Sequence, residues 1–205
     1  MLRALASFAL FCASTFVSLS FAFAQTQAPL HSQPYNLGER LRLPGVPNAA
    51  KVSERLYRGA QPRAEGIREL HTLGITTIVN LRKEGQDKIA WEQQTSESLG
   101  LRFVHIPVSG WSPPTDEQVA QFLGIFRENP QDKVFVHCHF GDDRTGVFVA
   151  TYRIAFDKFP VNEAIKEMDH FGFNRPWHPA MRTFVRGFPD PLASSAAFAE
   201  FRYHP

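Results

Sequence analysis

Residues 134–147 constrain this chain of 205 residues more than any other stretch. They run from Val134–His137, four residues typical of a buried strand, through Cys138 and five further residues to Arg144, where a helix is expected to begin. Open α/β sheets bind ligands at the carboxyl ends of their strands, and this is the position of Cys138. A loop this short must curl. We therefore expect Gly141 and Gly146 to relieve backbone crowding, the first where the chain turns and the second where the helix packs.

The chemistry expected of such a loop follows from its backbone. Its N–H groups, together with a helix N-terminus, form a concave nest for a tetrahedral anion. The same field stabilises a thiolate, so Cys138 is expected to be ionised at neutral pH and to act as a nucleophile. Arg144 supplies a planar fork of donors that matches two phosphate oxygens. The stretch thus predicts a cysteine nucleophile beside an arginine that binds phosphate.

The rest of the chain alternates between strand and helix patterns. Strand signals cover residues 55–57, 75–81, 101–106 and 134–137, and helical patterns lie between them at about 62–74, 88–99 and 115–128. The remainder is mainly helical, over residues 145–157, 161–171, from 179 until Gly187 and Pro189 interrupt it, and 192–203. This alternation predicts an α/β fold with a central, mostly parallel sheet of about four to five strands flanked by helices.

The N-terminal region predicts export to the periplasm or the medium. Residues 1–24 carry a positive start, an apolar run and a final Ala-Phe-Ala, as in a secretory signal cleaved before Gln25. An uncleaved anchor is the alternative, and it would be the chain's only expected membrane contact. Residues 25–50 are rich in proline and polar residues and are expected to form an extended, weakly ordered lead-in to one domain over residues 51–205.

Composition limits the partners and the role of the thiol. The 22 Lys and Arg nearly balance the 20 Asp and Glu, without a basic cluster that would indicate nucleic acid. Cys12 would be removed with the signal, which leaves Cys138 without a partner for an internal disulfide. No cofactor is implied. A metal site at His137-Cys138-His139 is not expected, because a strand points Cys138 away from both histidines.

His137-Cys138, five residues, then Arg144-Thr145-Gly146 resembles the signature of the protein tyrosine and dual-specificity phosphatase superfamily. Residues 56–62 and 77–82 are similar to the opening strands of its small bacterial and atypical dual-specificity members. The resemblance implies a phosphocysteine intermediate on Cys138 and substrate binding by Arg144 and by the loop, through His139, Phe140, Gly141, Asp142 and Gly146. It also implies that Thr145 stabilises the thiolate and that His137 orients the loop. The alternative roles, Thr145 as a helix cap and His137 as a core residue, remain open.

The general acid has two candidates. In the superfamily an aspartate on a mobile upstream loop usually protonates the leaving oxygen. The equivalent segment here, residues 107–117, offers Asp116, which also suits a helix start. Asp143 immediately precedes Arg144, a placement similar to the myotubularin lipid phosphatases, and is slightly favoured.

The acidic loop also bears on the substrate. Asp142 and Asp143 would repel a densely phosphorylated ligand, so we expect a singly phosphorylated one: a phosphotyrosine or phosphoserine protein, another phosphomonoester or a lipid head group. Arg82, Lys83 and Lys88 are candidates for a positive rim and Trp111 for a cleft wall, with solvated and core positions as alternatives. Two other functions stay open: a phosphate-binding module of the same fold with weak catalysis, and a rhodanese-like sulfurtransferase.

Overall fold

Within residues 35–173 and 176–202, which the computed structural model describes, six strands form one sheet in the order β1-β2-β3-β6-β4-β5. Four neighbouring strands are parallel to one another, in the order β3 (Leu56–Gly59), β6 (Val134–His137), β4 (Thr77–Arg82) and β5 (Arg102–Val108). The mostly parallel sheet is confirmed. The expected count of four to five strands is wrong, because β1 (Glu39–Arg40) and β2 (Ala50–Lys51) add an antiparallel edge beside β3.

This edge also corrects the predicted domain boundary. The segment from residue 35 to residue 50 belongs to the domain: Ala50 is fully buried and pairs with Arg58, and Val46 and Ala49 are buried beneath it. The expectation of a weakly ordered lead-in is therefore wrong for this part. Residues 25–34 and the predicted signal at 1–24 lie outside the described residues.

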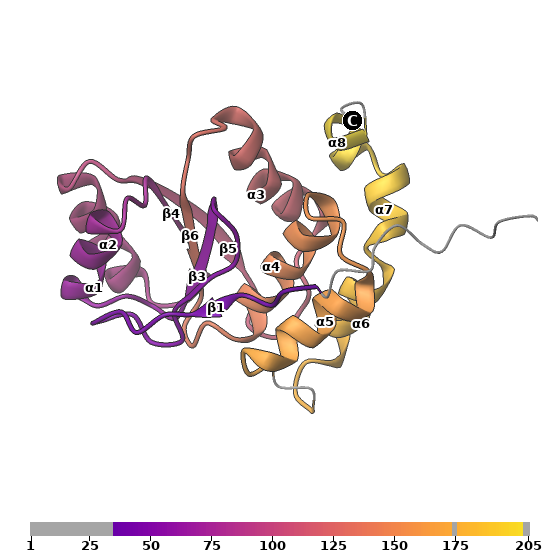
Figure 1. The fold of residues 1–205 in the computed structure, drawn as a ribbon, viewed down its shortest axis with the longest axis horizontal. Helices are drawn as coiled ribbons and strands as arrows, with labels where there is room; N and C mark the ends of the chain where they lie inside the picture. The colour runs from indigo at the N-terminus through magenta and orange to yellow at the C-terminus, as the bar shows by residue number, and fades with distance from the viewer. Residues whose placement is uncertain (1–34, 174–175, 203–205) are drawn as a thin grey trace, which may run out of the picture. The chain divides into compact units, whose positions relative to one another are not determined.

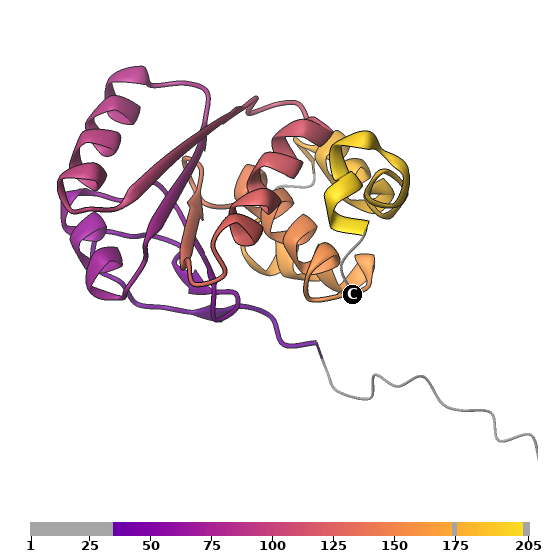
Figure 2. The ribbon, with the colours of Figure 1, turned by 90° about the horizontal axis from the view of Figure 1, so that it is seen from above.

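Helices cover both faces of the sheet (Figures 1 and 2). α1 (Ala64–Thr72) and α2 (Gln86–Ser98) lie on one face, and α3 (Asp116–Glu128), α4 (Asp143–Ala155), α5 (Val161–His170) and α6 (Pro179–Gly187) lie on the other. β6 shows how one strand serves both layers. Val134 and Val136 enter the core of the larger helical layer, and Phe135 between them enters the core under α1 and α2.

The C-terminal helical segment is divided more finely than its sequence pattern indicates. It consists of α7 (Pro189–Ser194), the 3₁₀ turn η1 (Ala196–Phe198) and α8 (Ala199–Arg202), because Ser195 is extended and ends α7. This segment packs back onto the domain through Phe198, which is fully buried with its ring edge-on to Phe188 at 5.4 Å. In the part of the chain that the structure describes, no helix has both the length and the hydropathy of a membrane-spanning segment.

Candidate functional site

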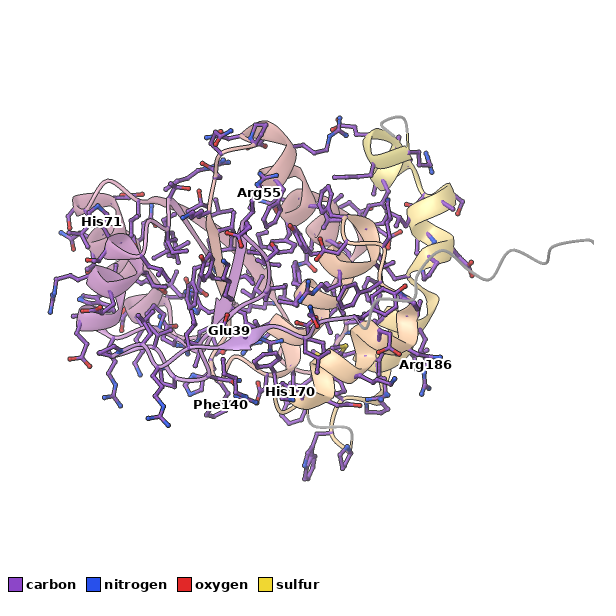
Figure 3. All side chains as sticks on the ribbon, viewed as in Figure 1. Glu39, Arg55, His71, Phe140, His170 and Arg186 are labelled. Carbon is purple, nitrogen blue, oxygen red and sulfur yellow. The ribbon has the colours of Figure 1, made fainter. Side chains whose placement is uncertain are left out.

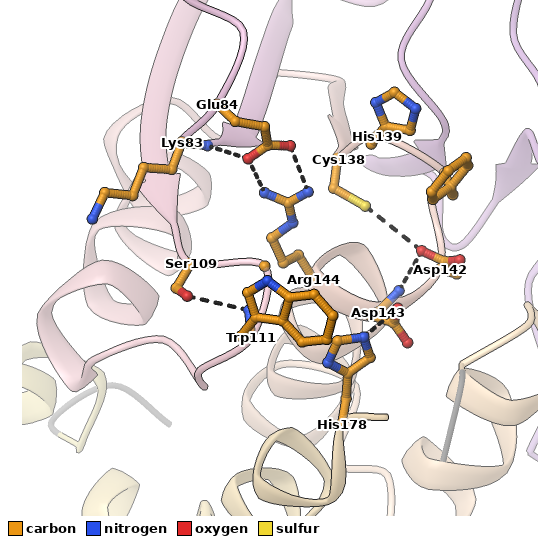
Figure 4. A pocket seen from close by; sticks show the side chains of 12 residues that line it. Lys83, Glu84, Ser109, Trp111, Cys138, His139, Asp142, Asp143, Arg144 and His178 are labelled. Carbon is orange, nitrogen blue, oxygen red and sulfur yellow. Dashed lines mark hydrogen bonds and ion pairs between the residues drawn. The ribbon is translucent and has the colours of Figure 1, made fainter. Parts of the chain in front are cut away.

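A pocket of about 550 Å³ opens at the carboxyl ends of the parallel strands (Figure 4). Four segments build it: the loop after β6, the turn after β4, the loop after β5 and the residue that precedes α6. Its lining consists of Lys83, Glu84, Ser109, Gly110, Trp111, Cys138, His139, Phe140, Asp142, Asp143, Arg144 and His178.

The loop between β6 and α4 forms the floor. Cys138 is only 2% exposed, and its Sγ lies 4.0 Å from Oδ1 of Asp142. The same Oδ1 accepts the N–H of Asp143 at 2.7 Å and caps α4. The N–H groups of residues 139–142 have no acceptor among the described residues. Four consecutive amides without a partner are the donor set of an anion nest, as expected.

Contacts from behind hold this loop in its curled form. Gly141 has a φ of +76°, and a Cβ there would lie 2.4 Å from the carbonyl carbon and oxygen of Gly59. Its carbonyl oxygen accepts hydrogen bonds from Arg58 at 2.6 Å and from Asn48 at 3.1 Å. The crowding expected at Gly141 is therefore confirmed. At Gly146 it is wrong, because a Cβ would meet Met168 only at an ordinary 3.5 Å.

Arg144 turns its guanidinium to the pocket beside Cys138 (Figure 4). Its Nη1 and Nη2 donate to the two carboxylate oxygens of Glu84, each at 2.9 Å. Burial disfavours the charged guanidinium, but Glu84 and the sulfur of Cys138 outweigh burial and raise the pKa of Arg144. In return, the hydrogen bonds from Arg144 lower the pKa of Glu84 to about 2. The pair is thus charged at neutral pH.

His137 serves both as a core residue and as a loop contact. It is fully buried, and its Nδ1 donates to the carbonyl of Cys138 at 3.0 Å. Its Nε2 lies 2.8 Å from Oε1 of the buried Glu92, outside the direction of a well-aligned hydrogen bond. The other oxygen of Glu92 accepts from Gln61 and Asn80, both at 2.6 Å. Burial acts to raise the pKa of Glu92, but His137 and these two donors lower it overall.

Thr145 is not a helix cap. Asp142 occupies the N-cap position of α4, so Thr145 lies in the first helical turn, directly after the loop that carries the nucleophile. That hydroxyl is buried and has no hydrogen-bond partner among the described residues. A buried, unpartnered hydroxyl next to the loop is consistent with the implied role toward the sulfur.

The structure gives the two candidate acids different surroundings. Asp116 lies in the first turn of α3, where Thr115 and Gln118 form a capping box, and it does not line the pocket. Its position is that of a helix start. Asp143 does line the pocket, and its Oδ2 lies 3.2 Å from Nε2 of His178.

The pocket mouth carries exposed aromatic side chains. Trp111 is 74% exposed and lines the pocket, so it forms a wall and is not a core residue. Phe140 is 67% exposed and projects outward (Figure 3). His139 is also exposed, and burial of part of its ring, followed by the charge of Arg82, lowers its pKa.

The predicted positive rim is only partly present. Lys83 lines the pocket, and Lys88 lines a separate hollow beside Trp91. Arg82 is buried, where it bonds to Glu84 and Gln61. Gly146, also expected to bind substrate, lies within α4 and does not line the pocket.

Sequence reasoning missed Glu84 and His178. Glu84 follows the end of β4, which is the neighbour of β6. The rule that ligands bind at the carboxyl ends of the strands, which indicated Cys138, therefore also applies to Glu84. His178 comes from a distant segment before α6, and no local pattern marks it.

A helix-flanked, mostly parallel sheet with cysteine, five residues and arginine at its carboxyl edge defines the dual-specificity and tyrosine phosphatase class. Residues 46–177 match the family model described as "DSP-PTPase phosphatase fused to NAD+ Kinase", and the chain belongs to this family.

Curated relatives agree with this assignment. Dual specificity protein phosphatase TpbA of Pseudomonas aeruginosa is 30% identical over 126 residues, which are 62% of this chain and 55% of that protein. Dual specificity protein phosphatase 26 of Rattus norvegicus is 32% identical over 131 residues, 61% of this chain and 60% of that protein. The chain therefore spans between 55% and 60% of the length of these relatives.

Solved structures share the fold. The crystal structure of P. aeruginosa TpbA superposes with a TM-score of 0.62 at 25% identity, over 74% of this chain and 89% of that one. The catalytic domain of the PP-IP phosphatase Siw14 from S. cerevisiae gives a TM-score of 0.64 at 19% identity, over 79% and 98% of the two chains.

Proposed function

We propose that this protein hydrolyses phosphomonoesters through a phosphocysteine intermediate on Cys138. One observation carries the proposal: the sulfur of Cys138 and the guanidinium of Arg144 face one pocket, and the amides of residues 139–142 in the same loop have no acceptor in the described part of the chain. Such a set of donors stabilises charge that develops on transferring phosphoryl oxygens.

The reaction takes place in two displacements. The thiolate of Cys138 attacks phosphorus while the bond to the leaving oxygen breaks, and Asp143 gives that oxygen a proton. Arg144 and the loop amides hold the phosphoryl oxygens during the transfer. Water then attacks the phosphocysteine, Asp143 takes a proton from the water, and the S–P bond breaks to release phosphate. The hydroxyl of Thr145 stabilises the sulfur as it leaves.

The walls of the pocket favour a singly phosphorylated aromatic substrate. Asp142, Asp143 and Glu84 line it together with the cations Arg144 and Lys83, so additional phosphates would meet several carboxylates. Trp111 and Phe140 provide exposed aromatic surface on which a ring can pack. A variant of P. aeruginosa TpbA has been crystallised with phosphotyrosine. We infer phosphotyrosine in a protein or peptide as the preferred substrate here.

The test is phosphate release from a panel of phosphotyrosine and phosphoserine peptides, phosphoinositides, nucleotides, sugar phosphates and 4-nitrophenyl phosphate. Wild type should turn over the aryl phosphates fastest, and Cys138→Ser should release no phosphate from any of them. Acid quenching should trap a labelled phosphoenzyme in wild type alone. Turnover by Cys138→Ser equal to that of wild type would refute the mechanism.

Export is proposed from residues 1–24, which lie outside the described part of the chain. Expression of the full chain in a Gram-negative host should give a periplasmic product whose N-terminus begins at Gln25. A cytoplasmic product that still begins at Met1 would exclude export by this segment.

A further inference from the structure

Arg82, at the end of β4, shares the carboxylate of Glu84 with Arg144. Arg82 is 5% exposed and does not line the pocket, but its Nε donates to Oε1 of Glu84 at 3.2 Å. The same Oε1 accepts a hydrogen bond from Nη2 of Arg144 at 2.9 Å. One carboxylate oxygen therefore joins a buried guanidinium to the guanidinium that lies beside Cys138 in the pocket.

Two further side chains hold Arg82 in place. Its Nη1 donates to Oε1 of Gln61 at 3.1 Å, and Nε2 of Gln61 donates to Oε2 of the fully buried Glu92 at 2.6 Å. The backbone N–H of Gln61 also donates to the carbonyl of His139 at 3.2 Å, in the loop of Cys138. Buried networks of this kind restrict the motion of their members. Arg82 is thus fixed relative to both the nucleophile's loop and the helix that carries Glu92.

The backbone of β4 is irregular where Arg82 leaves it. Asn80 pairs with His105 of β5, but Arg82 pairs with Val108, one residue beyond Pro107, which would be its regular partner. Proline has no N–H to give to the ladder of a sheet. Irregular pairing of this kind occurs next to active sites, where it changes the direction of a side chain. The local sequence therefore suits a special placement of Arg82.

Glu84 needs support of this kind. Its side chain is 51% exposed, whereas that of Arg82 is 6% exposed. A half-exposed side chain on a turn can adopt several rotamers, and restricting it to one costs entropy. A buried guanidinium with its own fixed partners restricts the carboxylate at one of its two oxygens. Arg82 also offsets the negative charge that Glu84 places near an incoming phosphate dianion.

We propose that Arg82 is a positioning residue that fixes the orientation of Arg144 through Glu84; this rests on the proposed function. Arg82 holds Glu84 in the orientation in which both carboxylate oxygens accept hydrogen bonds from Arg144. The guanidinium of Arg144 is then already aimed at the phosphoryl oxygens when the substrate enters. Because Arg82 does not line the pocket, its effect on the reaction passes through Glu84.

A double-mutant cycle tests this route, because two residues that act through one contact lose that contact only once. We would measure kcat/KM on 4-nitrophenyl phosphate and the inhibition constant of inorganic phosphate for wild type, Arg82→Met, Glu84→Ala and the double variant. Arg153→Met is the matched control, alone and combined with Glu84→Ala. Arg153 is also 5% exposed and pairs with a carboxylate, that of Glu167, but it does not line the pocket.

We expect Arg82→Met to lower kcat/KM by roughly tenfold and to weaken inhibition by phosphate by a similar factor. In the Glu84→Ala background the same substitution should cost less than about twofold. Arg153→Met should lower the unfolding temperature and leave kcat/KM within about twofold of its background. A loss from Arg82→Met that is equally large in both backgrounds, or no loss in the wild-type background, would overturn the proposal.

Thermal unfolding is recorded for every variant, because Arg82 is buried and its removal can prevent folding. If Arg82→Met does not fold, Arg82→Lys takes its place in the cycle. Lysine keeps the buried charge but lacks the planar fork that reaches Glu84 and Gln61 together. A loss that disappears in the Glu84→Ala background again supports the proposal, and no loss or an equal loss in both backgrounds rejects it.

The proposed function is tested separately, by turnover of 4-nitrophenyl phosphate in wild type and its absence in Cys138→Ser. Wild-type turnover that depends on Cys138, combined with equal losses in the two backgrounds, would reject only the role of Arg82.

Discussion

Glu84 binds Arg144 end-on, with each carboxylate oxygen accepting one hydrogen bond of 2.9 Å, from Nη1 and from Nη2. The carbonyl of Val108 accepts a further bond from Nη1 at 3.3 Å. Nη1 therefore uses both of its hydrogens on the protein. The Nε–H and one N–H of Nη2 remain on a single edge of the guanidinium, and this edge can hold two phosphate oxygens side-on. Glu84 thus orients the arginine without occupying its phosphate-binding edge.

Removing Glu84 should therefore weaken catalysis. We expect Glu84→Ala to lower kcat/KM on 4-nitrophenyl phosphate by roughly tenfold, or about 1.4 kcal/mol, because Arg144 loses its fixed orientation. Inhibition by inorganic phosphate should weaken in parallel. Glu128→Ala is the matched control, since it breaks an exposed ion pair with Arg102 and neither of these residues lines the pocket. Turnover by Glu84→Ala above that of wild type would show that the carboxylate competes with phosphate.

The same pair predicts a dependence of stability on pH. The hydrogen bonds from Arg144 lower the pKa of Glu84 from its ordinary 4.5 to about 2. A carboxyl group whose pKa is lowered by folding stabilises the protein above its unfolded pKa and loses that contribution as the pH falls to its folded pKa. The unfolding temperatures of wild type and Glu84→Gln should differ at pH 7, and the gap should close between about pH 4.5 and 2. The gap will be small because the Glu84 side chain is half exposed. A gap that is constant down to pH 2 would contradict the pairing.

The parts of the molecule that the sequence predicted are those whose signals are local. Strands β4, β5 and β6 have apolar, β-branched runs between helix patterns, and the loop from Cys138 to Arg144 is contiguous. Strands β1 and β2 have two residues each, too few for any periodicity, and their place is set by pairing with β3. Such pairing depends on tertiary contacts that no short window of sequence contains.

The residues of the site divide in the same way, into those with local sequence signals and those placed by tertiary contacts. Cys138, Arg144 and Asp143 are close in sequence and were found together. His178 reaches the pocket because α6 packs on the sheet's larger helical layer, and Glu84 because β4 lies beside β6. Asp116 carries signals for both catalysis and helix capping, and the capping box of α3 accounts for its position.

Two glycines near the nucleophile should respond differently to alanine. Gly141→Ala forces a side chain onto a φ of +76° and within 2.4 Å of the backbone of Gly59. We expect a loss of roughly 2–4 kcal/mol in the free energy of unfolding, from strain and overpacking. Gly146→Ala places a methyl group 3.5 Å from Met168 inside α4, where alanine favours the helix, so it should be neutral or gain up to about 1 kcal/mol. Urea unfolding of both variants gives the comparison, and equal destabilisation of the two would contradict the packing described for the loop.

Arg58 is expected to favour the thiolate from behind the loop. It is fully buried, stacks on Phe171 at 4.2 Å and donates to the carbonyl of Gly141 at 2.6 Å. Burial lowers the pKa of Arg58 to about 10, with Glu167 and Cys138 acting in the opposite direction, so the guanidinium remains charged at neutral pH. A buried cation near the sulfur stabilises its negative charge.

Arg58→Met should therefore slow the alkylation of Cys138 by iodoacetamide at pH 7 by roughly tenfold, or about 1.4 kcal/mol in the activation free energy. Asn48→Ala separates charge from mechanical support, because Asn48 donates to the same carbonyl of Gly141, at 3.1 Å, without carrying a charge. We expect Asn48→Ala to lower the unfolding temperature and to leave the rate of alkylation unchanged. If both variants slow alkylation equally, Arg58 acts only as a support for the loop, and the guanidinium has no electrostatic role at the sulfur.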